Sequence, residues 1–455
     1  MPVRCSVLVA ALGSLWLVAF APSAAAETIV QALASAYSSN PQINSARAQT
    51  RADDETIPIA RSGLLPVVSL FSTITGRHTD STMATDRTTL DGNVGLRVTQ
   101  NIFTGFRVRN ALRQSEAGVL ASRELLRNTV QNVLFDAAQA YMDVLRDIAI
   151  LDIRGRNVLF LDEQVRAANE RFNVGETTRT DVAQARARLA TSRAAVSLAE
   201  ANLAISRATY RQVVGHEPVG LADGFPYGRL VPGSLEQAVV LGQDRHPVIL
   251  AAINQADAQA FAVKQIEGEL LPTVSVEGTL EHDESFDSGG TDPNSATITG
   301  RVSIPLYQGG LVSARIRQAK EQYGLRKIEI DVARDQVRAA VVSAWAQAEA
   351  ARGAIAAADE GLEAAEIALS GVQEEQRVGQ RTTLDVLDGQ QELLSASETL
   401  IVARRDRVVA SFALLSAMGR LTAEDLALPA PVYDPTEHYR AVHNSIYGTR
   451  TPDGR

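Results

Sequence analysis

The sequence predicts a membrane protein of the α+β class, built as an internal duplication of long helices and short strands. Three observations support this prediction. Residues 28–66 match residues 234–272 at an offset of 206, and later segments match at an offset of 204. Two stretches of about 67 residues have the apolar spacing of helices and contain no proline. Four stretches of about ten residues alternate polar and apolar side chains, which is the pattern and length of tilted membrane-spanning strands.

The composition agrees with long helices and excludes one class of partner. Of the 455 residues, 45% are hydrophobic but only 5% are aromatic. Such a chain is typical of helices that pack through small side chains such as alanine. The formal net charge is −9, so the chain lacks the basic footprint of a nucleic-acid-binding protein. We therefore expect no nucleic acid among its partners.

Residues 1–26 have the pattern of a secretory signal peptide. Arg4 supplies the positive start, an apolar run follows, and three alanines offer a small-residue cleavage site before Glu27. The single cysteine, Cys5, lies within this segment, so we expect the mature chain to have no disulfide and no cysteine nucleophile. No other stretch is long and apolar enough to span a bilayer as a helix.

Two structural repeats, residues 27–230 and 231–428, are expected to follow, with a C-terminal tail over 429–455 whose last twenty residues we expect to be loosely ordered. Each repeat should contain an initial helix, a β-hairpin, a long helix, a tip and a return helix. The initial helices are expected over residues 41–63 and 247–269, because a proline near the first turn favours a helix start.

The β-hairpins are expected over residues 66–103 and 272–307, each after a Leu-Pro pair. In the second hairpin Val274, Val276 and Leu280 are apolar and alternate with polar residues. A hairpin that rests on a soluble core is the alternative. If the strands lie in a membrane, four of them cannot close a barrel, and an open edge in lipid would leave backbone groups unsatisfied. Several chains would then share one barrel, and their helices would enclose a channel.

The long helices are expected over residues 106–173 and 310–377, with return helices of about 37 residues. A helix of that length extends roughly 100 Å. The tips lie near residues 175 and 379, where a glycine can take the left-handed conformation that closes a helix.

Each return helix begins with a threonine and an acid that suit an N-cap. Thr178 precedes Asp181, and Thr382 precedes Asp385. Asp385 and Asp388 are three residues apart, so both carboxylates lie on one helix face. For Asp181 and Asp385, helix capping and a role in a functional site are both open, and the two are compatible.

The segment RVGQRTTLDVLDGQQ at residues 377–391, together with the duplicated plan and the Leu-Pro pairs, resembles the TolC family of outer-membrane export ducts. The resemblance covers nearly the whole mature chain. It implies a homotrimer with a twelve-stranded β-barrel in the lipid of the outer membrane, continued by a long α-helical barrel in the periplasm. It also implies a periplasmic adaptor (a membrane fusion protein) and an inner-membrane transporter, either an RND pump or an ABC exporter, as partners. The implied function is export, by multidrug efflux or by type I protein secretion.

The same resemblance implies site residues at the two tips. Asp385 and Asp388 match an acidic ring at the closed periplasmic entrance. Arg381 matches the basic half of a tip lock whose partners are Thr180 and Asp181. Gln376 stands where the prototype of the family has a tyrosine. The positions that match adaptor-contacting turns are Val174, Gly175, Val378 and Gly379.

The remaining sequence favours no catalytic class. It contains no phosphate-binding loop and no nucleophile elbow, and its six histidines are scattered without metal-ligand spacing. We therefore expect neither an enzyme nor a bound cofactor or metal. The competing class is a secreted coiled-coil structural protein or adhesin, which accounts for the helices but not for the four strands and matched tips.

Overall fold

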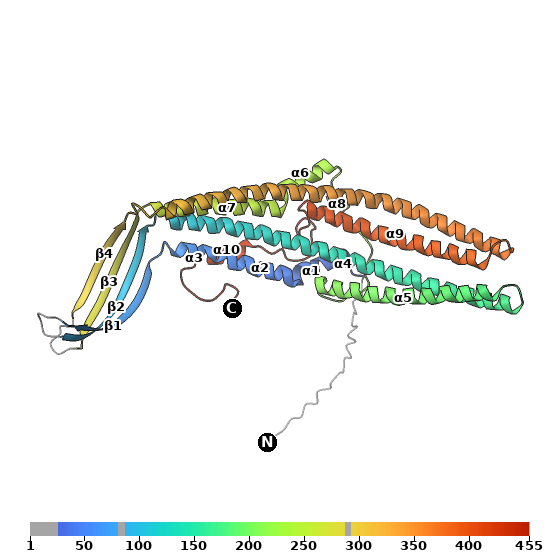
Figure 1. The fold of residues 1–455 in the computed structure, drawn as a ribbon, viewed down its shortest axis with the longest axis horizontal. Coiled ribbons are helices and arrows are strands. Elements are labelled where there is room, and N and C mark those ends of the chain that lie inside the picture. Colours follow the sequence, from blue (N-terminus) through green and yellow to red (C-terminus); the bar gives the residue numbers. More distant parts are fainter. Residues whose placement is uncertain (1–25, 81–86, 287–292, 455) are drawn as a thin grey trace, which may run out of the picture.

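The computed structural model describes residues 26–80, 87–286 and 293–454, which form an elongated molecule with a β-sheet at one end and two helical tips at the other (Figure 1). The predicted signal peptide lies outside these residues, except for Ala26. The first half contains α1 (Ile29–Ser39), α2 (Pro41–Asp54), α3 (Thr56–Ser62), β1 (Val67–Thr79), β2 (Arg87–Phe103), α4 (Arg107–Asn173) and α5 (Arg179–Val214). The second half contains α6 (Leu235–Arg245), α7 (Pro247–Glu267), β3 (Thr273–Ser285), β4 (Asn294–Ser303), α8 (Leu311–Arg377), α9 (Thr383–Ala417) and α10 (Thr436–Val442), with short 3-10 turns at Gly228–Leu230 and Gly268–Leu270.

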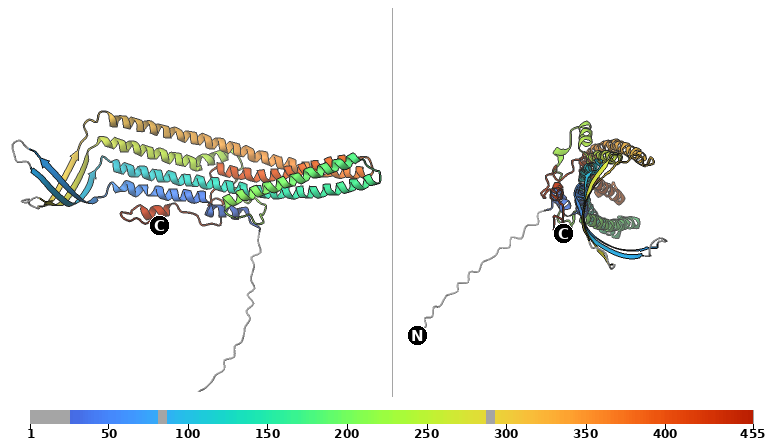
Figure 2. Two further views of the ribbon diagram at one scale, coloured as in Figure 1. Left: turned by 60° about the horizontal axis from the view of Figure 1, so that its bottom comes forward. Right: turned by 90° about the vertical axis from the view of Figure 1, so that its left-hand side faces the viewer.

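The two long helices have the predicted extent, and each has 67 residues. Helix α4 pairs with α5, and α8 pairs with α9, as two antiparallel hairpins. The seam of α8 is buried through small and β-branched side chains such as Val341, Ala344 and Ala348. Beside the sheet, α2, α4, α7 and α8 lie next to one another in one curved layer (Figure 2).

The four predicted strands form one antiparallel sheet in the order β1-β2-β3-β4. Leu96 lies opposite both Leu70 and Leu280, so apolar side chains gather on one face of the sheet. Leu70 is 77% exposed and Ile298 is 84% exposed. A hairpin resting on a soluble core would bury these side chains, so that alternative is wrong for the described strands.

The opposite face of the sheet is polar. Arg97 lies 3.6 Å from Glu277 of the neighbouring strand, and its guanidinium also stacks over the ring of Phe71 at 4.7 Å. Polar and apolar residues alternate along each strand, and successive side chains of a strand point to opposite faces of the sheet, so the two kinds of residue separate onto the two faces. Figure 2 shows that the sheet is curved, with its strands inclined to the helices.

The expected single helix over residues 41–63 is wrong, because the structure breaks it into α2 and α3 at Glu55. Pro58 is the reason. It has no N–H to donate to the carbonyl of Asp54, and its ring would clash with that carbonyl in a continuous helix. The matching helix α7 has no proline after its first residue and runs unbroken for 21 residues.

Two helices that the sequence analysis did not predict precede these segments. Helix α1 begins at a capping box in which Thr28 and Gln31 exchange hydrogen bonds, and α6 begins after Ser234, whose hydroxyl accepts from the N–H of Gln237. Both caps are visible in the sequence as Thr or Ser followed three residues later by Gln.

Helix α10 falls within the last twenty residues, where a loosely ordered segment was expected. Before the tail, Leu421, Leu426 and Leu428 of the second repeat are buried. The tail itself contacts the first half of the chain. The N–H of Tyr433 donates to the hydroxyl of Tyr37 at 3.0 Å. His438 of α10 lies 3.3 Å from the buried carboxylate of Asp54. These contacts come from distant parts of the chain, so the local sequence did not reveal them.

Candidate functional site

The two hairpin tips have the same backbone geometry. Gly175 has φ +82° and Gly379 has φ +78°, which is the left-handed region that favours glycine. At each tip three backbone N–H groups bond back to the last turn of the long helix, so the helix end is closed. The valine before each glycine points outward. Val174 is 71% exposed and Val378 is 72% exposed, so each tip presents an apolar side chain to its surroundings.

The return helices begin with matched capping boxes. The carboxylate of Asp385 accepts from the N–H and from the hydroxyl of Thr382, both at 2.8 Å. The carboxylate of Asp181 accepts from Thr178 in the same way and also from the hydroxyl of Thr177 at 2.6 Å. The Thr382 N–H and hydroxyl hold the pKa of Asp385 below its ordinary value, and Thr177 and then Thr178 lower the pKa of Asp181. Both acids therefore have the capping role.

Asp388 lies one turn further along α9 and has a different partner. Its carboxylate accepts from the guanidinium of Arg188 of α5 at 2.8 Å. Next to this ion pair, the amide of Gln390 donates to the side chain of Asn157 on α4 at 3.2 Å. The second hairpin is thus joined to the first near the tips by polar side chains from three helices.

An apolar contact reinforces this junction. Leu387, between the two aspartates, is 3% exposed. It belongs to a cluster of buried side chains from the first hairpin: Leu161, Ala168, Val182, Ala185 and Leu189. Leu387 and Arg188 were not singled out in the sequence, because their importance depends on which helix lies beside α9.

Arg381 binds within its own tip. Its Nε donates to the carboxylate of Glu375 at 2.8 Å. Among the described residues, no hydrogen bond or ion pair joins Arg381 to Thr180 or Asp181. However, Arg381 and Asp181 line the same groove between the tips, which has a volume of about 470 Å³. Gln376, where the prototype of the family has a tyrosine, donates to the hydroxyl of Thr383 at 3.3 Å.

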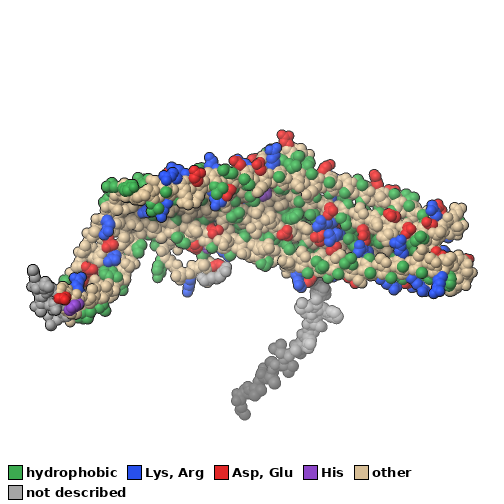
Figure 3. Space-filling view, in the orientation of Figure 1, with side chains coloured by type: hydrophobic (Ala, Val, Ile, Leu, Met, Phe, Trp, Pro, Cys, Tyr) green, Lys and Arg blue, Asp and Glu red, His purple; other side chains and the backbone are tan. Residues whose placement is uncertain are grey.

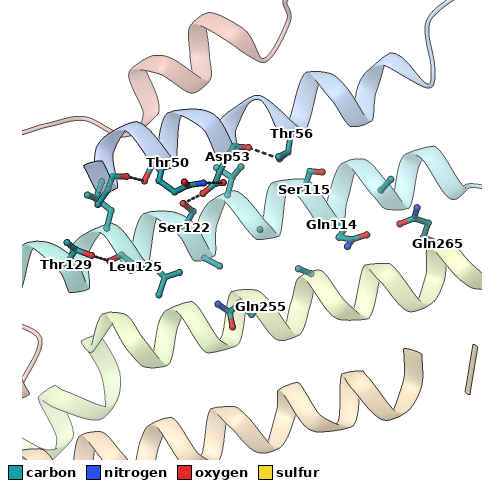
Figure 4. A pocket seen from close by; sticks show the side chains of 18 residues that line it. Thr50, Asp53, Thr56, Gln114, Ser115, Ser122, Leu125, Thr129, Gln255 and Gln265 are labelled. Atoms are coloured by element: carbon teal, nitrogen blue, oxygen red, sulfur yellow. Dashed lines mark hydrogen bonds between the residues drawn. The ribbon is translucent and has the colours of Figure 1, made fainter. Parts of the chain in front are cut away.

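A second groove, of about 780 Å³, lies between α2, α4 and α7, near the sheet (Figure 4). Its lining is rich in hydroxyl and amide groups, including Thr50, Gln114 and Gln255. The hydroxyl of Ser122 donates to Asp53, and that of Thr129 donates to the carbonyl of Leu125. These groups form a polar wall, and the bonds they make do not pair a nucleophile with a base.

Within the described ranges, none of the helices combines the length and the apolar character that crossing a membrane requires. The same residues include no cluster of three or more His, Cys, Asp or Glu side chains that could hold a metal ion. Charged side chains of both signs are interspersed along the helices (Figure 3). On the described strands, exposed large apolar side chains such as Leu70, Ile74 and Ile298 share one face of the sheet.

A four-stranded sheet with an exposed apolar face, joined to two long helical hairpins with matched tips, defines a protein of the outer-membrane channel class. The comparisons agree with that class. Residues 32–216 and 241–420 match the family described as Outer membrane efflux protein, and the chain belongs to this family.

Two relatives align over nearly the whole chain. The outer membrane efflux protein BepC of Brucella suis is 46% identical over 440 residues, which cover 95% of this chain and 94% of BepC. The outer membrane protein TolC of Escherichia coli is 27% identical, over 91% of this chain and 87% of TolC. Among solved structures, the CmeC outer membrane channel of Campylobacter jejuni superposes with a TM-score of 0.78 at 16% identity, covering 91% of this chain and 89% of CmeC.

These findings confirm the predicted location in the outer membrane and the predicted function in export. Proteins of this family are channels rather than enzymes. The alternative of a secreted coiled-coil protein or adhesin is not supported.

Proposed function

We propose that three copies of this chain form one efflux duct, with a twelve-stranded barrel in the outer membrane and an α-helical tunnel in the periplasm. The observation that carries the proposal is the sheet. Its edge strands β1 and β4 each have one side without a partner strand among the described residues, and its apolar face is exposed. An apolar face suits contact with lipid. The edge strands also need hydrogen-bonding partners inside a membrane, and strands of further copies would provide them.

In this duct the signal peptide, residues 1–26, is removed, and the repeats, residues 27–230 and 231–428, alternate around the axis. The tail from residue 429 lies beside the helices. The relative with 46% identity is named an efflux protein, so efflux is favoured over type I secretion. The transporter is accordingly an RND pump in the inner membrane, and a periplasmic adaptor connects it to the duct.

The tips form the periplasmic entrance. Asp385 and Asp388 of each copy provide its acidic ring. In the closed entrance, the guanidinium of Arg381 leaves its present partner Glu375 and binds Thr180 and Asp181 instead; all of these residues lie at the tips. The exposed side chains of Val174 and Val378, beside Gly175 and Gly379, are the contacts for the adaptor. Exposed apolar side chains on an otherwise polar tip suit such a contact.

The test is reconstitution of the detergent-purified mature protein in planar bilayers, with its mass measured in detergent. We expect a trimer that conducts ions, and Arg381→Ser should raise the resting conductance. In cells, crosslinking should capture an adaptor and an RND-type transporter, and deletion of the gene should raise sensitivity to toxic compounds. A monomer that conducts would overturn the shared barrel. Loss of protein secretion with unchanged drug sensitivity would replace efflux by secretion.

A further inference from the structure

A pocket of about 250 Å³ lies where the chain after α9 crosses the first half of the molecule. Its walls come from three distant parts of the chain: Tyr37 of α1 and Arg47 of α2, then α4 between residues 123 and 130, and finally residues 422–424 and 432–435. Figure 2 shows α10 and the neighbouring tail on the convex side of the curved helical layer. The pocket shares no lining residue with the groove between the tips, so it is a separate site.

Arg47 is held in this pocket by neutral groups. Its guanidinium lies between two aromatic rings, with Cζ 4.7 Å from the ring centre of Tyr37 and 5.1 Å from that of Tyr433. It donates to the side chain of Asn44 at 3.0 Å and to the carbonyl of Tyr37 at 3.1 Å. These two bonds leave further N–H groups of the guanidinium available. Arg47 therefore keeps its full charge in a half-buried position.

The other two arginines of the pocket have acidic partners. Arg123 lies 3.4 Å from the carboxylate of Asp54, and Arg127 lies 2.8 Å from that of Glu124. Arg47 forms no ion pair with any carboxylate in the described part of the chain. In addition, Nε of Arg123 is buried and has no hydrogen-bond partner among the described residues. Both observations favour an anion in the pocket.

The lining also indicates what kind of anion fits. Its charged side chains are three arginines and two glutamates, so their formal balance is +1, which a single negative charge neutralises. Much of the remaining lining is apolar: Leu126, Val130, Ala423, Val432 and Pro435. Such a lining suits a carboxylate attached to a short apolar body. The volume is below the roughly 300–1,000 Å³ that is typical of drug-sized ligands, so the ligand is small.

The duplicated fold does not require the aromatic and basic side chains of this pocket. The counterparts of Tyr37 and Arg47, 206 residues further along the chain, are Gln243 and Ile253. Ile253 packs against the main buried core, so this position of the fold accepts an apolar side chain. The half-buried charge of Arg47 loses hydration at the same position of the first half, and a bound anion would offset that loss.

We propose that this pocket binds a small organic carboxylate. The carboxylate accepts hydrogen bonds from Arg47, and the apolar part of the ligand lies against Leu126 and Val130. Because residues 422–424 and 432–435 form part of the lining, a bound ligand holds the chain after α9 to α2 and α4. On the convex side of the helical layer the ligand is bound without passing through the proposed duct. It is thus a solute that stabilises the tail and not exported cargo.

The experiment uses the full chain purified in a non-ionic detergent, with hexanoate as the probe and hexanamide as its neutral match. Ligand-detected NMR titration measures affinity, and amide hydrogen exchange of α10 reports how firmly the tail is held. We expect hexanoate to bind at least about tenfold more tightly than hexanamide, because only the carboxylate forms charge-assisted hydrogen bonds with Arg47. We also expect hexanoate to slow hydrogen exchange in α10.

Arg47→Met removes the charge and nearly keeps the length of the side chain, so it should weaken hexanoate binding at least about tenfold. Arg51→Met, one turn further along α2 and outside the pocket lining, is the matched control and should bind hexanoate as the parent does.

A second variant keeps Arg47, because Arg47→Met also removes the stacking on the two tyrosines. Val432 lines the pocket and is 50% exposed, so Val432→Trp should narrow the pocket at a side chain that is not part of the core. It should weaken hexanoate binding while the stacking of Arg47 remains. Equal hexanoate affinity in the parent, Arg47→Met and Val432→Trp proteins would overturn the proposal, as would equal affinity of the parent for hexanoate and hexanamide.

Discussion

Asp385 and Asp388 are three residues apart in the sequence but have different partners. Asp385 is held by Thr382 of its own helix turn, whereas Asp388 is held by Arg188 of the other hairpin. In the proposed entrance, part of the negative charge of Asp388 is therefore offset by an arginine from the same chain. The two aspartates look equivalent in the sequence, but in the structure Asp385 caps the helix and Asp388 forms an ion pair.

Removal of Arg188 should strengthen the acidic ring. We expect Arg188→Ala to lower the concentration of divalent or trivalent cations that blocks the channel by roughly several-fold, because each copy then exposes one more uncompensated carboxylate. Current through planar bilayers measures the block. Arg186→Ala is the matched control, since Arg186 of the same helix donates to the neutral Asn169. Equal effects of the two variants would contradict a specific contact between Arg188 and the ring.

The capping threonine should control the first turn of α9. We expect Thr382→Ala to weaken this turn by about 1 kcal/mol, the usual cost of losing an N-cap. Since folding lowers the pKa of Asp385, its stabilisation is present above the ordinary aspartate pKa and is lost as the pH falls through the folded-state pKa. Amide hydrogen exchange of residues 383–387, corrected for intrinsic rates, measures both effects. Thr178→Ala should loosen α5 and leave α9 unchanged; fraying of both helices would speak against local caps.

At the scale of elements, the strands are distinguished by their two faces. Val98 lies on the apolar face with Leu96, and the adjacent Thr99 lies on the polar face opposite Glu277. The hydroxyl of Thr99 is 3.5 Å from that carboxylate. If the apolar face contacts lipid, position 98 therefore needs an apolar side chain, whereas position 99 tolerates a polar or charged one.

We expect Val98→Arg to impair assembly, with a cost of roughly 2–4 kcal/mol for an arginine on the lipid face near the midplane. Thr99→Arg is the matched control, because the new guanidinium would face Glu277. The fraction of heat-stable oligomer in outer membranes measures assembly. If both arginines reduce that fraction equally, the apolar face does not contact lipid.

At the scale of the whole molecule, the two hairpins of a chain are joined by ion pairs between α4 and α9. Arg154 contacts both carboxylate oxygens of Glu398, and it also donates to the carbonyl of Ala195 on α5. Its hydrogen bond with Glu398 raises the pKa of Arg154. Such bidentate, partly buried pairs fix how two elements lie relative to each other.

A double-mutant cycle of Arg154→Ala and Glu398→Ala should show a coupling of about 1 kcal/mol, at the upper end for partly exposed pairs. Hydrogen exchange of residues 150–160 and 394–402 reports the opening free energy. The control cycle uses Arg352 and Glu349, an exposed pair within α8, and should show a coupling near zero. A coupling of the same size in both cycles would mean that the Arg154 pair does not hold the hairpins together.

Features that depend only on neighbours along the chain can be predicted from the sequence. The helical and strand periods, the Val-Gly turns and the Thr–Asp caps require only a few consecutive residues, and the extents of α4 and α8 followed from them. The break at Pro58, the capping box of α1 and the Ser234 N-cap of α6 are also features of the local sequence.

Which residues meet across the two hairpins depends instead on the tertiary structure. Arg188 and Asp388 are 200 positions apart, and Arg154 and Glu398 are 244 apart. Leu387 packs against side chains of the first hairpin because α9 lies against α4 and α5. No local pattern encodes such pairs, since each depends on how two helices pack and not on the preference of either one.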